Sequence, residues 1–303
     1  MGLTPGVPAP EESSRLLGDP VGLRAALDRS GYLLLRGLLP AGELGELAGE
    51  LAGVLVGAGW AEPVGHPGGP LLPTERARRE AGDPVAARVV GRALYCVEAA
   101  HRLPHHPRLL ELFGTLLGPG PLLVHPHPAC RAVLPEGPEG SRATPAHQDH
   151  LGMQGTRETF TAFLALRPCP LEAGPLALAA GSQLGGSRPY RSSPGSRVFG
   201  CDESGLEGTW VAGGLEPGDV LLFHSLTVHR ALPNRSGEIR LSLDARYQGA
   251  GDPVSEISIR ERADLPWETL YAGWSRTDLR RYWEELPLEV VPFDPTAHLG
   301  GRG

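Results

Sequence analysis

Residues 218–247 read GDVLLFHSLTVHRALPNRSGEIRLSLDARY, and this stretch says most about the fold. Gly218-Asp219 is typical of a turn, and the apolar run Val220–Phe223 after it predicts a buried strand. A polar segment leads to a second apolar run, Ile239–Tyr247, which predicts another strand. Short strands without a helix between them indicate an antiparallel sheet and not the strand–helix–strand units of a parallel one.

The same pattern extends back to Gly118-Pro119, where the spacing of apolar residues along the chain changes. From there on, short apolar runs alternate with turn residues. The further runs that predict strands are Leu122–Val124, Phe160–Leu166 and Leu176–Ala179. Strands of this length and spacing are typical of an antiparallel sandwich or barrel.

The first 118 residues are predicted to be mostly helical. Leucines at helical spacing predict an amphipathic helix over residues 41–56. Two further helices are expected over 84–100, with a proline in its first turn, and over 107–117. One apolar run between glycines, Tyr32–Leu35, predicts a buried strand.

Length and composition favour one domain with elaborations. The 303 residues, 41% of them hydrophobic, are enough to bury a sizeable core. We expect a flexible N-terminus over residues 1–14, a single domain over 15–295 and a tail over 296–303. Within the domain, a β-rich core over about 119–250 follows the helical part. The aromatic residues after it predict a C-terminal segment that packs onto the domain.

Charge and apolar pattern exclude several classes of function. The net charge of −7 argues against a surface for nucleic acid or anionic membrane. No apolar run reaches the about 18 residues of a transmembrane helix, and the first residues lack the pattern of a signal peptide. The four cysteines are scattered, which predicts reduced thiols in a cytoplasmic protein. We therefore expect a small-molecule substrate, with no nucleic acid and no membrane as partner.

The segment Pro145-Ala146-His147-Gln148-Asp149 carries the first chemical signal. Alternate residues of a strand share a face, so His147 and Asp149 can project together from an extended chain. With a second imidazole from elsewhere they make the facial triad that suits Fe(II) and leaves coordination positions open. Taken alone, the signal is weak, because an isolated His-x-Asp pair is better explained as a surface or hydrogen-bonded pair.

The stretch that opened this section supplies the second imidazole. His229 follows the first of its strands, and Arg240 comes 11 residues later in the second. 2-Oxoglutarate chelates iron through its keto-carboxylate end, and its far carboxylate needs a bidentate cation. Arginine provides that geometry better than lysine. The spacing of His229 and Arg240 therefore favours an iron and 2-oxoglutarate site over a solvated charge on a strand.

These motifs resemble the phytanoyl-CoA dioxygenase-like branch of the Fe(II)/2-oxoglutarate oxygenases, over about residues 28–250. The matching segments are Ser30-Gly31-Tyr32, Arg36-Gly37-Leu38-Leu39, His147-Gln148-Asp149, Gly174-Pro175-Leu176, Gly181-Ser182, Gly218-Asp219, His229, Asn234-x-Ser236 and Arg240. The resemblance implies a mainly β fold, with a double-stranded β-helix (a cupin-like jelly roll) and flanking helices. It implies three iron ligands, which are His147, Asp149 and His229. It also implies that Arg240 anchors the 2-oxoglutarate carboxylate.

The chain departs from the family pattern at a few positions near the motifs. Phe163 stands where the family often has Trp, and Ala231 where it often has Ser or Gly. Gln183 replaces the usual His after Gly181-Ser182. Thr161 and Arg131 are candidates for the cosubstrate pocket, with plain strand positions as the alternative for each.

The substrate pocket is the least constrained part of the prediction. Loops decide specificity on such scaffolds, and the segments 60–83 and 185–208, which lack periodicity, are candidate lids. The second segment is polar and poor in large apolar residues, which favours a small polar metabolite, such as a hydroxylated or sugar-containing one, over a fatty acyl or terpene skeleton. The residues expected to line the pocket are His150, Gln154, Phe163, His127, Arg188, Tyr190 and Arg191. No catalytic residue is expected beyond the metal centre.

The resemblance implies an oxygenase that uses Fe(II), 2-oxoglutarate and O2 to hydroxylate or oxidatively cyclise a small metabolite, plausibly in bacterial natural-product biosynthesis. Asp149 argues against the related halogenases, which have a small residue at this position. Two alternatives remain open at this point. One is a jelly-roll isomerase or lyase that binds metal without 2-oxoglutarate, in which Arg240 has no purpose. The other is a noncatalytic jelly roll that binds a ligand.

Overall fold

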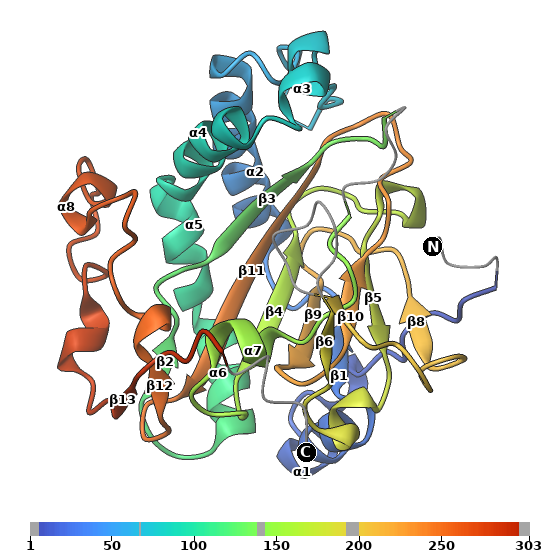
Figure 1. Cartoon of the computed structure of the whole chain (residues 1–303), viewed down its shortest axis with the longest axis vertical. Helices are drawn as coiled ribbons and strands as arrows, with labels where there is room; N and C mark the ends of the chain where they lie inside the picture. The colour runs from blue at the N-terminus through green and yellow to red at the C-terminus, as the bar shows by residue number, and fades with distance from the viewer. Residues whose placement is uncertain (1–5, 67, 138–142, 192–199, 297–303) are drawn as a thin grey trace.

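A computed structural model of the chain describes residues 6–66, 68–137, 143–191 and 200–296. Two β-sheets lie at its centre, and helices cover the outer face of the larger sheet (Figure 1). The helices are α1 (Pro20–Ser30), α2 (Ala41–Gly57), α3 (Glu75–Glu80), α4 (Pro84–Tyr95), α5 (Glu98–Arg102), α6 (Pro107–Leu117), α7 (Asp149–Met153) and α8 (Trp267–Leu270). The strands are β1 (Tyr32–Leu35), β2 (Leu122–Val124), β3 (Ala129–Val133), β4 (Phe160–Ala165), β5 (Leu176–Ala179), β6 (Tyr190–Arg191), β7 (Gly200–Cys201), β8 (Trp210–Ala212), β9 (Val220–His224), β10 (His229–Ala231), β11 (Arg240–Gly249), β12 (Val254–Ser255) and β13 (Val290–Val291).

The two central sheets are antiparallel throughout. The larger has the strand order β1-β9-β4-β11-β2, with β3 also paired to β11, and the smaller has the order β10-β5-β8. Side chains from both sheets, among them Phe163 of β4 and Leu178 of β5, meet in one buried cluster between them. The antiparallel jelly roll expected from the sequence is confirmed.

Strand β11 shows how the sequence divides the two faces of the larger sheet. Its odd-numbered side chains, from Leu241 to Tyr247, are buried in the core beneath the helices. Tyr247 stacks on Phe113 of α6 with 3.7 Å between ring centroids. Since alternate residues of a strand point to opposite faces, the even-numbered side chains, 240–248, face the space between the sheets. These five are all polar, so β11 brings a polar row into an otherwise apolar interior.

The helical layer follows the predicted periodicity, with two differences. Helix α2 buries the predicted leucines, and α6 has the predicted bounds. The helix predicted over 84–100 is instead two, because the chain turns at Cys96-Val97 between α4 and α5. The segment 60–83, predicted to be a loop, contains α3. Thr74 starts this helix by accepting a hydrogen bond from the N–H of Ala77 at 3.1 Å, a normal N-cap.

Two segments expected to lack structure are ordered in part. The N-terminus was predicted to be flexible over 1–14, yet the Pro8 carbonyl accepts from Ala212 of β8 at 3.0 Å. Ser13 donates to Leu34 of β1 at 2.8 Å. That prediction is wrong for residues 8–13, because a proline-rich chain can lie extended along a sheet. Likewise, 185–208 contains the paired strands β6 and β7, while 192–199 lie outside the described residues.

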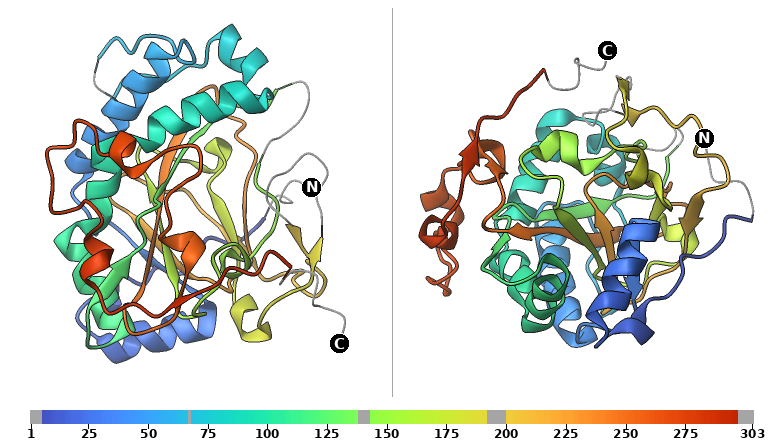
Figure 2. Two further views of the ribbon diagram at one scale, coloured as in Figure 1. Left: turned by 60° about the vertical axis from the view of Figure 1, so that its left-hand side comes forward. Right: turned by 90° about the horizontal axis from the view of Figure 1, so that it is seen from below.

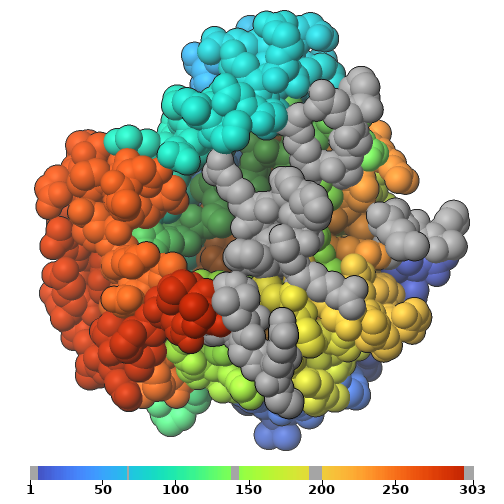
Figure 3. All heavy atoms as spheres, in the orientation of Figure 1, coloured from blue at the N-terminus to red at the C-terminus, as the bar shows by residue number. Residues whose placement is uncertain are grey.

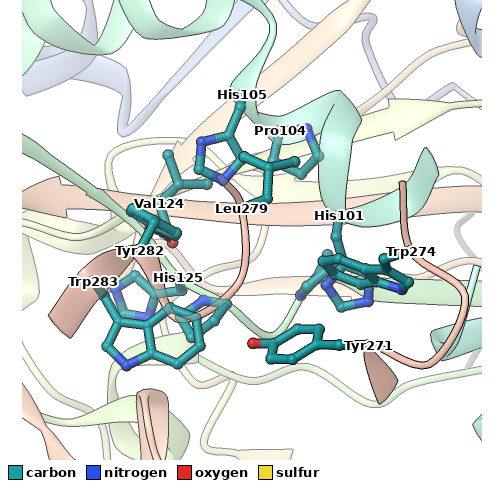
Figure 4. Close-up of a pocket in the computed structure, with 12 residues that line it drawn as sticks. His101, Pro104, His105, Val124, His125, Tyr271, Trp274, Leu279, Tyr282 and Trp283 are labelled. Carbon is teal, nitrogen blue, oxygen red and sulfur yellow. Dashed lines mark hydrogen bonds between the residues drawn. The ribbon is translucent and has the colours of Figure 1, made fainter. Parts of the chain in front are cut away.

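The C-terminal segment packs onto the domain, as its aromatic residues predicted. Trp267, Trp274 and Trp283 are buried in a cluster with Tyr95 of α4 and Leu123 of β2. Figure 2 shows this segment, coloured orange to red, along one side of the helices and sheet. The close-up in Figure 4 shows aromatic and histidine side chains from the segment and from the domain around one small cavity.

Two buried histidines beneath the segment are expected to make its docking sensitive to acid. The ring of His101 packs against that of Trp274, and the ring of His105 against that of Tyr282, with 4.8 Å between the ring centroids in both pairs. Burial lowers the pKa of each histidine to about 4. In the unfolded chain their pKa is about 6.5, so between about pH 6.5 and 4 only the unfolded chain takes up these protons. We expect the free energy of unfolding, measured by urea titration of tryptophan fluorescence, to fall as the pH is lowered through this window.

The double variant His101→Gln/His105→Gln serves as the control for this expectation. Glutamine has no proton to gain, so the difference in urea midpoint between pH 7 and pH 5 becomes smaller than in the wild type. An unchanged difference in the double variant contradicts the assignment of the acid sensitivity to these two imidazoles.

No helix in the described part of the chain is long and apolar enough to cross a membrane. All four cysteines lie within the described residues, and each has a free thiol there.

Candidate metal centre

The two histidines of the predicted triad are joined through their main chains. His147 forms an isolated antiparallel bridge with His229, the first residue of β10. The N–H of His147 donates to the carbonyl of His229 at 2.9 Å, and the N–H of His229 donates back at 3.0 Å. The centroids of their rings are 4.1 Å apart. The pairing places both imidazoles at one end of the smaller sheet.

Asp149 completes the triad from a helix and not from a strand. It is the first residue of α7, after an extended Gln148. The expectation that His147 and Asp149 share one strand face is therefore wrong, because the backbone changes from extended to helical between them. Oδ1 of Asp149 nevertheless lies 3.6 Å from Nε2 of His147. It lies 3.7 Å from Nε2 of His229.

Main-chain carbonyls orient both imidazoles. Nδ1 of His147 is 2.8 Å from the carbonyl oxygen of Pro145, and Nδ1 of His229 is 3.0 Å from that of Thr227. A carbonyl only accepts, so each Nδ1 carries a proton, and each Nε2 is the ring nitrogen that faces Asp149. Burial lowers the pKa of His229 to about 4, which keeps it neutral at pH 7. The three ligand atoms lie within 4.8 Å of one another, and this donor set fits Fe(II).

The second oxygen of Asp149 is bound by the larger sheet. Oδ2 accepts a hydrogen bond from Oγ1 of Thr161 at 2.8 Å and another from Nε of Arg246 at 3.2 Å. Burial by itself raises the pKa of this carboxyl. The positive charge of the Arg246 guanidinium is the largest effect in the opposite direction, and the pKa lies well below its usual range. The carboxylate is therefore charged at neutral pH, as a metal ligand has to be.

Arg240 lies on the same interior face of β11, and its surroundings fit an anion. Its side chain is buried, with one terminal N–H donating to the carbonyl of Gly174 and its guanidinium 5.8 Å from the ring centre of Phe163. Burial lowers its pKa from the ordinary value. Nε has no hydrogen-bond partner among the described residues. A buried guanidinium with an unused donor costs free energy, and a bound carboxylate satisfies it.

The two further candidates for the cosubstrate pocket have partners of their own. The hydroxyl of Thr161 is occupied by Asp149, as described above. Arg131 of β3 donates from Nε to Oδ2 of Asp244 at 2.7 Å. Oγ of Ser242 and Oδ1 of Asp244 are buried without a partner among the described residues. The polar row of β11 thus keeps unused hydrogen-bonding atoms between Arg240 and the triad.

The candidate substrate residues after the triad divide between the centre and the C-terminal segment. His150 lies in α7 beside Asp149, and its Nδ1 is buried without a partner among the described residues. Gln154 instead bonds the main chain of Asp294 through both amide atoms, at 2.7 and 2.8 Å. His127 bonds the hydroxyl of Tyr95 and stacks on an indole of the C-terminal segment.

The candidates on the second predicted lid are tied to Gln148, the residue between two ligands. Oε1 of Gln148 accepts from the N–H of Arg188 at 2.8 Å, and its carbonyl accepts from the hydroxyl of Tyr190 at 2.9 Å. Its amide group donates to Leu226 at 2.6 Å in the turn before β10. The side chain of Arg191 lies outside the described residues. Arg188 and Tyr190 therefore lie next to the centre, where the bonds described here join them to Gln148.

Sequence reasoning missed two residues of the site. Gln148 was quoted in the motif without a role, although its side chain is 1% exposed and joins three segments. Arg246 was not considered. The alternation in β11 could have identified it, since Arg246 shares the parity, and hence the face, of Arg240.

A comparison with protein families agrees with this geometry. The family model described as phytanoyl-CoA dioxygenase (PhyH) matches residues 27–242, which contain all three members of the triad and Arg240. The chain belongs to the phytanoyl-CoA dioxygenase family. The matched segment begins before β1 and ends within β11, so it spans both sheets and most of the helical layer.

This family member is similar to several enzymes from natural-product pathways and to their solved structures. The 1-deoxypentalenic acid 11-beta-hydroxylase of Streptomyces arenae is 31% identical over 248 residues, which are 78% of this chain and 83% of the relative. The epimerase SnoN, solved with Fe3+, alpha ketoglutarate and nogalamycin RO, has a TM-score of 0.56 at 24% identity, covering 78% of this chain and 86% of SnoN. EvdO2 from Micromonospora carbonacea var. aurantiaca, solved with 2-oxoglutarate, has a TM-score of 0.54 at 18% identity. The match covers 82% of this chain and 94% of EvdO2.

The family assignment gives the class of enzyme. This phytanoyl-CoA dioxygenase family member is a non-haem oxygenase that depends on iron and 2-oxoglutarate. The assignment favours the oxygenase over the isomerase or lyase and over the noncatalytic jelly roll set out above. The solved neighbours, at less than 25% identity, support the fold.

Proposed function

We propose that this oxygenase hydroxylates an unactivated C–H bond of a small metabolite, with iron held by His147, Asp149 and His229. The observation that carries the proposal is the convergence of two imidazoles and one carboxylate on a common point. Bound iron, with 2-oxoglutarate and O2, supplies the oxidising power for the C–H bond. The protein contributes ligand orientation, a buried carboxylate and an interior that excludes bulk water.

Arg240 is proposed to hold the far carboxylate of 2-oxoglutarate. Its buried guanidinium has an unused Nε donor, and it projects from the same face of β11 as Arg246, which contacts Asp149. A dicarboxylate that reaches from the triad to Arg240 therefore lies along the polar row of β11. Such a site distinguishes 2-oxoglutarate from a monocarboxylate by the charge-assisted bonds at its far end.

The substrate is proposed to be a small metabolite with polar groups, in natural-product biosynthesis. The relatives are named for hydroxylation of an acid, 1-deoxypentalenic acid, which favours hydroxylation over cyclisation for this chain. Figure 3 shows a hollow on one face, between the cyan helices and the orange C-terminal segment, where β3 and β11 run in Figure 1. The free thiols support a cytoplasmic location.

An anaerobic titration of the metal-free protein tests the proposal. Addition of Fe(II) and then 2-oxoglutarate is expected to produce the visible charge-transfer absorption of their chelate, and admission of O2 with an accepted substrate to release succinate. Titration with glutarate, which lacks the keto group, controls for binding of a dicarboxylate alone and gives no such band. Normal metal binding without the band contradicts the assignment of Arg240 and the triad to this cosubstrate.

A further inference from the structure

The two oxygens of Asp149 have different surroundings, and the difference has a chemical consequence. Oδ1 faces the Nε2 atoms of both histidines at 3.6 and 3.7 Å. Oδ2 is turned the other way and accepts two hydrogen bonds from the larger sheet. A free carboxylate has two equivalent oxygens and can bind a metal through one or through both. Here the two oxygens are distinguished before any metal is bound.

We propose that Thr161 and Arg246 are positioning residues that reserve Oδ1 of Asp149 for the metal. The inference rests on the proposed function, since it takes Asp149 as an iron ligand. With Oδ2 held by a hydroxyl and a guanidinium, the carboxylate cannot rotate to chelate the metal through both oxygens without losing two hydrogen bonds. A coordination position is thereby kept for the cosubstrate.

The pairing of β4 with β11 fixes the geometry of this clamp. Thr161 and Arg246 are directly opposite each other in the antiparallel register. Side chains of directly opposed residues lie close together on one face of a sheet, so the two donors converge on a single acceptor. Thr161 is 1% exposed and the side chain of Arg246 is 17% exposed. A threonine and an arginine at this register therefore act as one unit on Asp149.

The interior contains a second arginine–aspartate pair that provides a matched control. Arg131 binds Asp244 at 2.7 Å on the same side of the larger sheet, and neither residue has a hydrogen bond to Asp149. Removal of Arg131 takes one positive charge from the same interior face of the sheet and leaves the contacts of Oδ2 in place. The comparison with Arg246 therefore separates positioning of the ligand from the general loss of charge.

The test measures Co(II) affinity and the visible Co(II) d–d spectrum of the metal-free protein, without 2-oxoglutarate or substrate. We expect Thr161→Val and Arg246→Gln each to weaken Co(II) binding about 10- to 100-fold, the range typical for loss of a partner that orients a metal ligand. The intensity of the d–d bands is expected to change, because a released carboxylate alters the coordination. Thr161→Ser keeps the hydroxyl and is expected to have the wild-type Co(II) affinity and d–d spectrum. Arg131→Gln is expected to change neither the affinity nor the spectrum.

Two results overturn the inference, and they differ in what they leave standing. If the wild type binds Co(II) and gives the Fe(II)–2-oxoglutarate band, but both variants bind Co(II) with the wild-type affinity and spectrum, the positioning role fails and the proposed function stands. If the wild type binds no metal, both fail. The double variant adds a further check: because both donors act on one oxygen, its loss in binding free energy is smaller than the sum of the single losses.

Discussion

The His229→Ala variant is expected to lose metal binding and, with it, the Fe(II)–2-oxoglutarate absorption. The substitution removes one of three ligand atoms and the buried ring that packs against His147. Loss of a residue that only orients a ligand already costs 10- to 100-fold in affinity, so loss of the ligand itself costs more than about 100-fold. The measurement is a Co(II) or Fe(II) titration of the metal-free variant, followed by succinate release with substrate.

His224→Ala is the matched control for this loss. His224 precedes His229 by five residues at the end of β9, but its Nδ1 accepts from the N–H of Leu226 at 3.0 Å and its Nε2 faces Glu158 at 3.4 Å. It is outside the group of ligand atoms, so the variant is expected to keep the wild-type metal affinity. Full metal affinity in His229→Ala, or its loss in His224→Ala, contradicts the proposed ligand set.

The Arg240→Gln variant is expected to bind metal normally and to lose most of its affinity for 2-oxoglutarate. Removing one partner of a buried, charge-assisted pair costs about 3 kcal/mol, which corresponds to roughly a 100-fold increase in Kd. The amide of Gln is shorter and uncharged, so it cannot replace the two-pronged contact. The experiment titrates 2-oxoglutarate into the Fe(II)-loaded variant under anaerobic conditions and follows the visible band.

Two further variants separate charge from geometry at this position. Arg240→Lys keeps the charge and loses the planar fork, so we expect an affinity between those of the wild type and of Arg240→Gln. Arg235→Gln removes an exposed arginine five residues earlier that pairs with Glu136 at 3.5 Å, and it leaves the titration unchanged. Wild-type affinity in Arg240→Gln is incompatible with the proposed carboxylate anchor.

Much of the fold could be predicted because its strands and helices are strongly patterned. The predicted bounds of β5 and α6 agree with the structure. The apolar run of β5 stops at the turns on either side, and the helical repeat of α6 stops where the helix ends, so each pattern indicates its own bounds. Strands β3 and β10 were missed for the opposite reason. They are short, mix small, polar and apolar residues, and are recognised only by their pairing with β11 and β5.

The triad could be predicted from spacing, but the network around it could not. His147 and Asp149 are two residues apart, so almost any local backbone keeps them close, and even the wrong expectation of a strand brought them together. Arg246 and Asp149 are 97 residues apart in the sequence. Their contact depends on the register between β4 and β11, which local spacing does not reveal. The bonds between Gln154 and Asp294 span 140 residues and depend on how the C-terminal segment docks.

The main-chain pairing of His147 with His229 bears on how new specificities can be engineered into this scaffold. Main-chain N–H and C=O groups set the spacing of these two ligands, and these groups are the same whichever side chains surround them. Mutant libraries directed at side chains around the hollow over β3 and β11 can therefore change what the enzyme accepts while the two histidines keep their separation. The scaffold separates the spacing of the two histidines, which the backbone sets, from the side chains around the hollow, which are open to selection.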